Sequence, residues 1–240
     1  MDREIRSVLL VDGSASVLFY VGMLLKRLEY RVATAQSAED ALRSMEGSLP
    51  SIVVADTILP GMSGTDLLRR IKNSPKMKSV PVVILTSRSD AGLKEECERL
   101  GCSGFLCKPV EPDALYRRLQ AVSESIPRAN IRIATSLKVV LRAAAPGGVE
   151  RTECATEISE GGLFIRTPDP LPKDATLLVR VALPHREVSA KAVVRYSYAA
   201  TAGSSKQPGM GMKFVEISDA DRREIGDFIK EKLVGDIAPQ

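Results

Sequence analysis

The sequence contains no tryptophan and a single histidine, His185, among its 240 residues. One histidine argues against a Ser-His-Asp hydrolase and against a metal centre built from several histidines. No apolar run approaches the roughly 18 residues that a membrane-spanning helix needs, and residues 1–4 do not resemble the start of a signal peptide. We therefore expect a cytoplasmic protein without membrane insertion.

The four cysteines show no Cys-x-x-Cys spacing, so they do not form a recognisable zinc site. Without an export signal they should stay reduced, and burial in the core is the simplest role for them. Cys107 follows this expectation, because we place it on a central strand. The others are Cys97, Cys102 and Cys154.

Composition and charge are ordinary for a folded protein. Apolar residues make up 44% and charged residues 27% of the chain, which argues against extensive disorder. The formal net charge of +4 is too small to indicate a nucleic-acid-binding protein, and no helix-turn-helix motif is evident, so we expect no DNA binding. A length of 240 residues allows one large domain or two small ones.

The first half predicts an α/β domain over residues 1–124. Five short apolar runs alternate with five segments of helical periodicity, which indicates a doubly wound, five-stranded parallel sheet of the flavodoxin type. The expected strands are residues 7–11, 30–33, 52–55, 80–85 and 104–107, and the expected helices lie near residues 17–28, 38–45, 64–71, 91–100 and 115–122.

The second half has a different character. Residues 125–134 read as a linker, and residues 135–240 contain six short segments rich in Val, Thr and Ile, which predict an all-β, six-stranded antiparallel barrel. A final helix is expected from Ser218, whose hydroxyl can cap it. The expected strands lie near residues 137–142, 152–158, 163–167, 176–183, 188–198 and 210–215.

Four polar residues follow strands of the expected parallel sheet: Asp12, Asp56, Thr86 and Lys108. The carboxyl ends of these strands should converge. A carboxylate can attack a phosphoryl group when a cation neutralises the charges, and Mg²⁺ prefers oxygen ligands such as these two carboxylates. The lysine and the threonine can hold the remaining phosphoryl oxygens.

These residues resemble the receiver domain of bacterial two-component response regulators. The matching stretches are Val8-Leu-Leu-Val-Asp12, Asp56-Thr-Ile-Leu-Pro-Gly-Met-Ser-Gly64, Ile84-Leu-Thr-Ser87 and Phe105-Leu-Cys-Lys-Pro109. The resemblance implies that Asp56 accepts a phosphoryl group from a histidine kinase, with Thr86 and Lys108 contacting it. It also implies that Asp12, Asp56 and the Ile58 carbonyl bind Mg²⁺ and that the Lys108–Pro109 bond is cis. The Phe105 side chain would change its rotamer when Asp56 is phosphorylated.

One position departs from the receiver pattern. Receivers usually carry two adjacent acidic residues after the first strand, whereas this chain has Asp12 followed by Gly13. The loss should weaken Mg²⁺ binding, and Ser14 is a poor substitute for a charged ligand. Two interpretations stay open: Asp56 is phosphorylated slowly, or the receiver serves only as a docking surface.

The linker carries Arg128 and Arg132, and Glu157, Ser159 and Gly162 follow about 25 residues later. An arginine fork can bond guanine and phosphate, a carboxylate can accept from guanine N–H groups, and glycine allows close approach of the backbone. This pattern resembles PilZ domains, which are receptors for cyclic di-GMP. The resemblance implies that these five residues bind that nucleotide.

Glu157 departs from the Asp or Asn of the PilZ pattern and is one methylene longer, which should weaken binding. The alternatives are a nucleotide receptor and a PilZ-like adaptor that binds none. Neither half contains a convincing turnover site, so we do not expect an enzyme. We expect a two-component signalling protein that acts on a partner of the motility, pilus or polysaccharide machinery, or else a scaffold with both sites silent. Receivers often pair through their fourth and fifth helices, so a homodimer is a further alternative.

Overall fold

The computed structural model describes residues 6–88, 90–125, 127–143, 149–199, 208–235 and 237. The opening residues 1–5 and residue 126 of the expected linker lie outside this set. The chain forms two compact units, Met1–Ala129 with Leu233–Gln240, and Asn130–Lys232.

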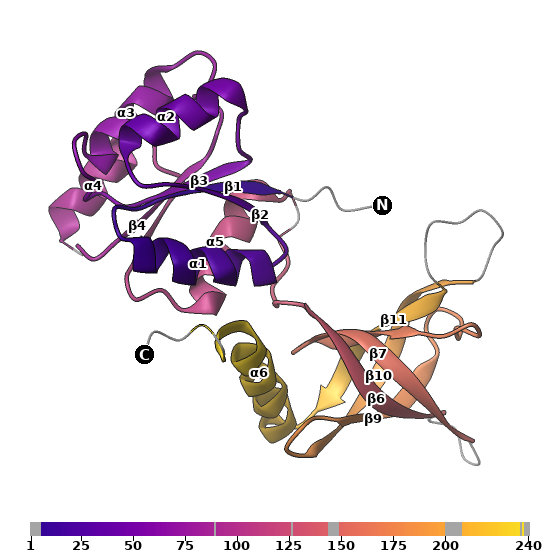
Figure 1. Cartoon of the computed structure of the whole chain (residues 1–240). Coiled ribbons are helices and arrows are strands. Elements are labelled where there is room, and N and C mark those ends of the chain that lie inside the picture. The colour runs from indigo at the N-terminus through magenta and orange to yellow at the C-terminus, as the bar shows by residue number, and fades with distance from the viewer. Residues whose placement is uncertain are drawn as a thin grey trace. The chain divides into compact units, whose positions relative to one another are not determined.

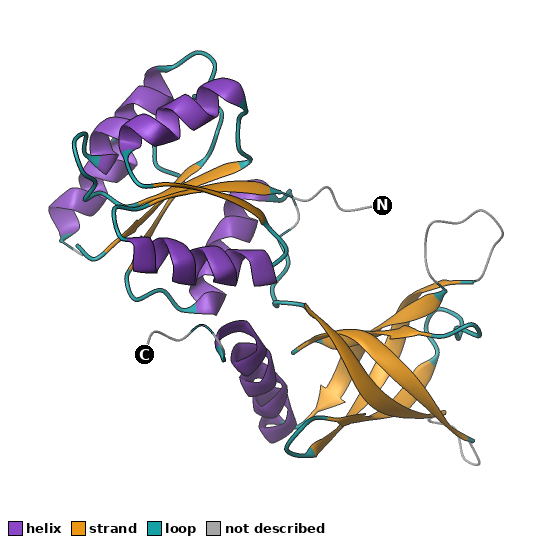
Figure 2. Ribbon diagram, viewed as in Figure 1, coloured by secondary structure: helices purple, strands orange, loops and turns teal. Residues whose placement is uncertain are grey.

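The first unit contains a five-stranded parallel sheet, as expected (Figures 1 and 2), and its strand order is β2-β1-β3-β4-β5. Helices α1 and α5 cover one face of this sheet and α2 and α3 cover the other (Figure 1). The strands are β1 (Ser7–Val11), β2 (Arg31–Ala35), β3 (Ile52–Ala55), β4 (Val82–Thr86) and β5 (Gly104–Cys107). The helices are α1 (Ala15–Arg27), α2 (Ala38–Gly47), α3 (Gly64–Asn73), α4 (Ala91–Arg99) and α5 (Pro112–Ser123).

The burial of each strand follows its place in the sheet. Strands β3 and β4 are buried along their whole length because helices cover both faces, which explains their continuous apolar sequences. Strand β5 is an edge strand and is only partly covered. The expectation that Cys107 is buried on a central strand is therefore wrong: it ends the edge strand and its side chain is exposed.

The second unit is a closed six-stranded antiparallel barrel, as expected (Figure 2), and its strand order is β10-β11-β8-β7-β6-β9. Closure leaves no free sheet edge. Strand β6 begins at Ile133, so the last two residues of the expected linker belong to the barrel. The remaining strands are β7 (Glu150–Ser159), β8 (Gly162–Arg166), β9 (Thr176–Ala182), β10 (Glu187–Tyr198) and β11 (Gly209–Ile217).

The final helix is α6 (Asp219–Val234), and it begins where the sequence indicated. The Ser218 hydroxyl accepts a hydrogen bond from the Asp221 backbone N–H at 3.0 Å, which satisfies one of the free N–H groups at the helix start. Arg222 of this helix donates to the carbonyl of Glu160 at 3.0 Å, so the first turns of α6 are fixed against the turn between β7 and β8.

Candidate functional site

The carboxyl ends of β1, β3 and β5 bring together two carboxylates and one ammonium group. Asp12 follows β1 and Asp56 follows β3, and their side chains are only 4% and 7% exposed. Lys108 follows β5 and its Nζ donates to both carboxylates, reaching Asp56 Oδ2 at 2.5 Å. The sequence predicted that these three residues converge, and the structure confirms it.

The other oxygen of each carboxylate also has a partner. Oδ1 of Asp56 accepts from the backbone N–H of Ile58 at 3.1 Å, and Oδ1 of Asp12 accepts from the backbone N–H of Ser14 at 2.9 Å. Burial raises the pKa of Asp56, but the hydrogen bonds from Lys108, Ile58 and Thr86 outweigh it and hold that pKa below its ordinary value. The Asp56 carboxyl group is therefore ionised at neutral pH.

Lys108 shows the complementary effect. Burial lowers the pKa of its ammonium group, but the hydrogen bonds and charges of Asp12 and Asp56 more than compensate, so its pKa is raised above the ordinary value. The lysine is therefore a fixed positive charge between the two carboxylates.

Thr86 is fully buried at the end of β4, and its hydroxyl lies 2.7 Å from the hydroxyl of Thr57. Thr57 is itself 7% exposed, and its hydroxyl donates to Asp56 Oδ1 at 3.4 Å. Thr57 was not among the site residues predicted from the sequence. Its position directly after the expected nucleophile, at the same edge of the sheet, was the signal that could have found it.

Gly13 supplies no ligand, and Ser14 is engaged elsewhere, because its hydroxyl caps α1 by accepting from the backbone N–H of Val17. Among the described residues, no three His, Cys, Asp or Glu side chains lie close enough to hold a metal ion together. Two carboxylates do lie together, however, and Mg²⁺ is commonly bound through one or two carboxylates with several waters retained. The donor set therefore fits Mg²⁺ with one charged ligand fewer than the receiver pattern.

The other residues named for this site occupy its surroundings. The Lys108–Pro109 bond is cis, as the resemblance implied. Phe105 is partly buried and packs against the core of the first unit, and the Ile58 side chain is 57% exposed. A switching role for Phe105 and metal binding by the Ile58 carbonyl stay predictions.

In the second unit, the turn between β7 and β8 is tightly packed. The Ser159 hydroxyl donates to the carbonyl of Gly162 at 3.1 Å, and the Gly161 carbonyl accepts from the backbone N–H of Phe214. A Cβ at Gly162 would lie 2.0 Å from the carbonyl oxygen of Met212, so only glycine fits there. This glycine is therefore required for packing of the barrel, whatever else it does.

Arg132 and Glu157 lie together beside this turn. Their side chains form an ion pair with 3.9 Å between Nη1 and Oε2, and both are about half exposed. Arg128 lies in the first unit, where its backbone N–H donates to Gln120 Oε1 at 3.3 Å, whereas the other four predicted nucleotide ligands lie in the second unit. The structure thus brings four of the five predicted residues together near the turn between β7 and β8.

Asn130 is a neighbour of this site that the sequence analysis missed. A Cβ at Gly161 would lie 2.6 Å from Asn130 Nδ2, which means that the asparagine amide covers the outer side of that glycine. Its position midway between the two predicted arginines was the available signal. The amide adds a hydrogen-bonding group next to the Ser159–Gly162 turn.

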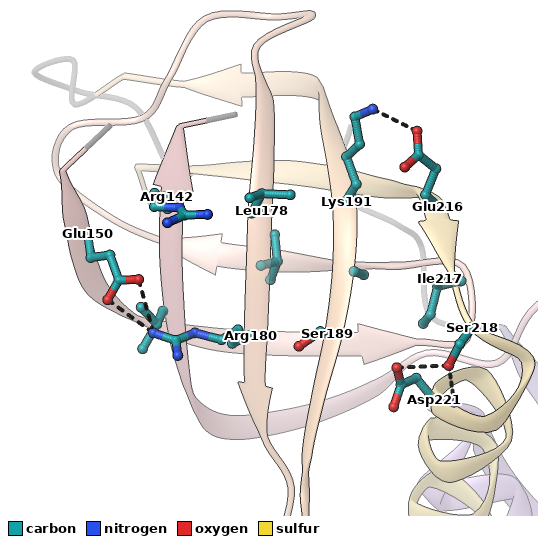
Figure 3. Close-up of a pocket in the computed structure, with 13 residues that line it drawn as sticks. Arg142, Glu150, Leu178, Arg180, Ser189, Lys191, Glu216, Ile217, Ser218 and Asp221 are labelled. Carbon is teal, nitrogen blue, oxygen red and sulfur yellow. Dashed lines mark hydrogen bonds and ion pairs between the residues drawn. The ribbon is translucent and has the colours of Figure 1, made fainter. Parts of the chain in front are cut away.

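A separate hollow of about 770 Å³ lies on the outer surface formed by β6, β9, β10 and β11 (Figure 3). Two of its cations are already neutralised, since Arg180 pairs with Glu150 and Lys191 pairs with Glu216 at 2.6 Å (Figure 3). None of the predicted nucleotide ligands lines this hollow. We therefore place the candidate nucleotide site at the β7–β8 turn and not here.

Comparison with protein families matches residues 8–120 to the response regulator receiver domain and residues 127–231 to the PilZ domain. Among curated proteins, the chain is 36% identical over 113 residues to the two-component response regulator ORR6 of Oryza sativa subsp. japonica, covering 46% of this chain and 66% of that protein. It is 35% identical over 112 residues to ORR3 of the same plant, covering 46% of this chain and 85% of that protein.

The chain spans very different shares of its relatives. It is 31% identical over 124 residues to histidine kinase P4 of Formosa agariphila, which is 52% of this chain but 9% of that protein. Among solved structures, the chemotaxis response regulator CheY4 of Vibrio cholerae is 28% identical and aligns with a TM-score of 0.47, covering 50% of this chain and 99% of that one.

Proposed function

The chain belongs to the two-component response regulator family and carries a PilZ domain behind its receiver domain, and on this premise we propose that it combines two signals. The first signal is phosphorylation of Asp56 by a histidine kinase. The second is binding of cyclic di-GMP by the PilZ domain. The output is a contact with another protein, and we expect a component of the motility, pilus or polysaccharide machinery as that partner.

The contact of Lys108 with both Asp12 and Asp56 is the observation that carries the first part. Asp56 is ionised and lies at the carboxyl ends of the parallel strands, where its carboxylate can act as the nucleophile. The Lys108 ammonium group beside it can hold a phosphoryl oxygen. Thr57 and Thr86 add two hydroxyl groups within hydrogen-bond distance of each other.

Asp12, Asp56 and the Ile58 carbonyl would hold Mg²⁺, which supplies the positive charge that lets two anions approach. The chain's own contribution is to orient Asp56 through the backbone N–H of Ile58 and to keep it deprotonated. Because Gly13 removes one charged ligand, we expect phosphorylation to need more Mg²⁺ than in a receiver with two adjacent acidic residues.

The proposed binding of cyclic di-GMP rests on the ion pair of Arg132 and Glu157 near the turn between β7 and β8. Their ion pair is long and half exposed, so it contributes little to stability and can be exchanged for contacts with a ligand. The Arg132 guanidinium group can then bond guanine or phosphate, and the Glu157 carboxylate can accept from guanine N–H groups. Binding of the nucleotide by Arg128 stays a prediction.

Receiver and PilZ domains are regulatory domains, so the protein is not expected to be an enzyme. In the part of the chain that the structure describes, no helix has the length and apolar character needed to span a bilayer. We propose that it works in the cytoplasm, where a histidine kinase and a nucleotide messenger can both reach it.

A scaffold with both sites silent is the second candidate, and two observations favour it. Gly13 removes a carboxylate from the receiver site, and Glu157 already neutralises Arg132 in the free protein. Each feature is compatible with a weakened site as well as with a lost one, so binding measurements must separate the two candidates.

Incubation with acetyl phosphate and excess Mg²⁺, followed by intact mass spectrometry, tests the first part. We expect the mass to increase by one phosphoryl group, and we expect no increase in Asp56→Asn, which keeps the shape of the side chain but is not a nucleophile. An unmodified protein after prolonged incubation would favour the scaffold.

A further inference from the structure

An aromatic pair lies on the outer surface of the barrel, directly beside Glu157. Phe164 of β8 and Tyr196 of β10 stack with 6.3 Å between their ring centroids and an interplanar angle of 25°. Tyr196 is 37% exposed although it is a large aromatic side chain, and Phe164 is partly exposed. We call Phe164 and Tyr196 the aromatic shelf.

The strand register places this shelf in line with the candidate nucleotide site. Glu157 pairs with Phe164, Phe164 pairs with Gly211, and Gly211 pairs with Tyr196. Directly opposed residues on neighbouring antiparallel strands project from the same face of a sheet. The Glu157 carboxylate and the two rings therefore form one continuous row across β7, β8, β11 and β10.

Two glycines of β11 make room for the rings. A Cβ at Gly211 would lie 2.2 Å from Tyr196 Cζ, and a Cβ at Gly209 would lie 2.7 Å from Phe164 Cζ. Each ring therefore fills the space that a side chain on β11 would otherwise take. Tyr196 also contacts the ring of Tyr198, with 5.5 Å between the ring centroids and an interplanar angle of 47°, and it keeps 37% of its surface exposed.

Unpaired cations flank the shelf on the same face. Lys213 lies opposite Gly162, two residues before Phe164 on β8, and Arg166 lies two residues after Phe164. One cation therefore lies on each side of the aromatic shelf along β8. Both side chains are exposed, and neither forms an ion pair or hydrogen bond with another residue in the described part of the chain. Rings bordered by unpaired cations, with a carboxylate at one end, match the chemistry of a purine nucleotide: stacking for the base and positive charge for phosphate.

We propose that the aromatic shelf stacks one guanine base of cyclic di-GMP, with Glu157 at the edge of that base and Lys213 or Arg166 near a phosphate. This inference rests on the proposed function, since it assigns residues to the same nucleotide. It adds a stacking surface that none of the five predicted ligands provides. Phe164 and Tyr196 thereby become determinants of affinity for a purine.

Calorimetric titration of the full chain with cyclic di-GMP tests the shelf. Removing a base-stacking ring should weaken binding about 5-fold to 150-fold, so we expect this loss in Tyr196→Leu and in Phe164→Leu. Tyr196→Phe keeps the ring and should bind within about twofold of the unmodified protein. Leu178→Ala, on the outer face of β9 (Figure 3), is the matched control and should not change the affinity.

Tyrosine fluorescence gives a second readout, because the chain has five tyrosines and no tryptophan. Stacking of guanine on Tyr196 should quench the emission on saturation with cyclic di-GMP. Tyr196→Phe should lose that part of the quenching while it still binds. Thermal melting of each variant verifies that its barrel is folded, and Tyr196→Leu is the safer variant because its side chain is the more exposed of the two.

The outcomes separate the two proposals. If the unmodified protein binds and Arg132→Ala binds weakly, but both leucine variants bind as tightly as the unmodified protein, the shelf is wrong and the receptor function stands. A flat titration of the unmodified protein overturns both.

Discussion

Replacing Gly13 by aspartate should restore the charged ligand that the receiver site lacks. The backbone at Gly13 does not adopt a positive φ, so an L-residue fits without backbone strain. A Cβ there would lie 3.2 Å from Pro60 Cδ, a contact that a shift of a few tenths of an ångström relieves. The substitution therefore changes mainly the charge of the site.

The size of the effect follows from the charges. Asp12 and Asp56 carry −2 and Lys108 carries +1, so the present site has a formal charge of −1. An added carboxylate about 5 Å from a divalent cation would contribute about 3 kcal/mol per unit charge at an effective dielectric constant of about 20. Solvent exposure and competition from Lys108 reduce this, so we expect Mg²⁺ affinity to rise about 10-fold to 100-fold.

Gly13→Asn is the matched control, because asparagine has the same shape and makes the same contact with Pro60 without the charge. Calorimetric titration with MgCl₂ should give tighter binding for Gly13→Asp than for Gly13→Asn and the unmodified protein. The Mg²⁺ concentration needed for half-maximal labelling by acetyl phosphate should fall in parallel. Equal Mg²⁺ affinities for the two folded variants would refute the argument that the missing carboxylate limits the site.

Four further predictions concern stability. Lys108→Met leaves two buried carboxylates without a counter-charge and should lower the free energy of unfolding at pH 7 by about 3 kcal/mol, measured by urea denaturation; an unchanged midpoint would contradict the ion-pair geometry. The folded pKa of Asp56 lies below 3.8, so its ionised form stabilises the fold above pH 3.8. This contribution is lost as the pH falls through the lower folded pKa. The free energy of unfolding of Asp56→Asn should therefore depend less on pH in the acid range. Lys108, with a folded pKa above 10.5, contributes below pH 10.5 and loses that contribution as the pH rises through the higher value. Gly162→Ala should destabilise the barrel by about 3 kcal/mol or more, because its Cβ would meet the Met212 carbonyl. Gly22→Ala, with open space around it, is the control and should leave the stability unchanged. Equal melting temperatures for the two variants would contradict the prediction.

The receiver fold and its site could be predicted from the sequence because each step is local. Continuous apolar runs mark buried parallel strands, and the residues that end them must meet at one edge of the sheet. Asp12, Asp56 and Lys108 follow that rule. The prediction that Cys107 is buried was wrong because the sequence does not show the order of the strands within the sheet. Cys107 ends β5, which lies at the edge of the sheet.

The barrel site was harder to predict because its parts meet through register. Phe164 and Tyr196 are 32 positions apart and come together only because both border Gly211. Asn130 reaches Gly161 only once the chain has turned into β6. Neither juxtaposition has a periodicity or a spacing that a single sequence reveals, since antiparallel register depends on turns and bulges such as the shift between Val194 and Tyr196.

We propose that this response regulator also receives a nucleotide signal through its barrel. Calorimetric titration of the full chain with cyclic di-GMP, repeated on Arg132→Ala, tests it most directly. We expect saturable binding that the substitution weakens at least about tenfold, because Arg132 would lose bidentate bonds to guanine or phosphate. No heat of binding at any accessible nucleotide concentration would contradict the claim and leave the scaffold function in its place.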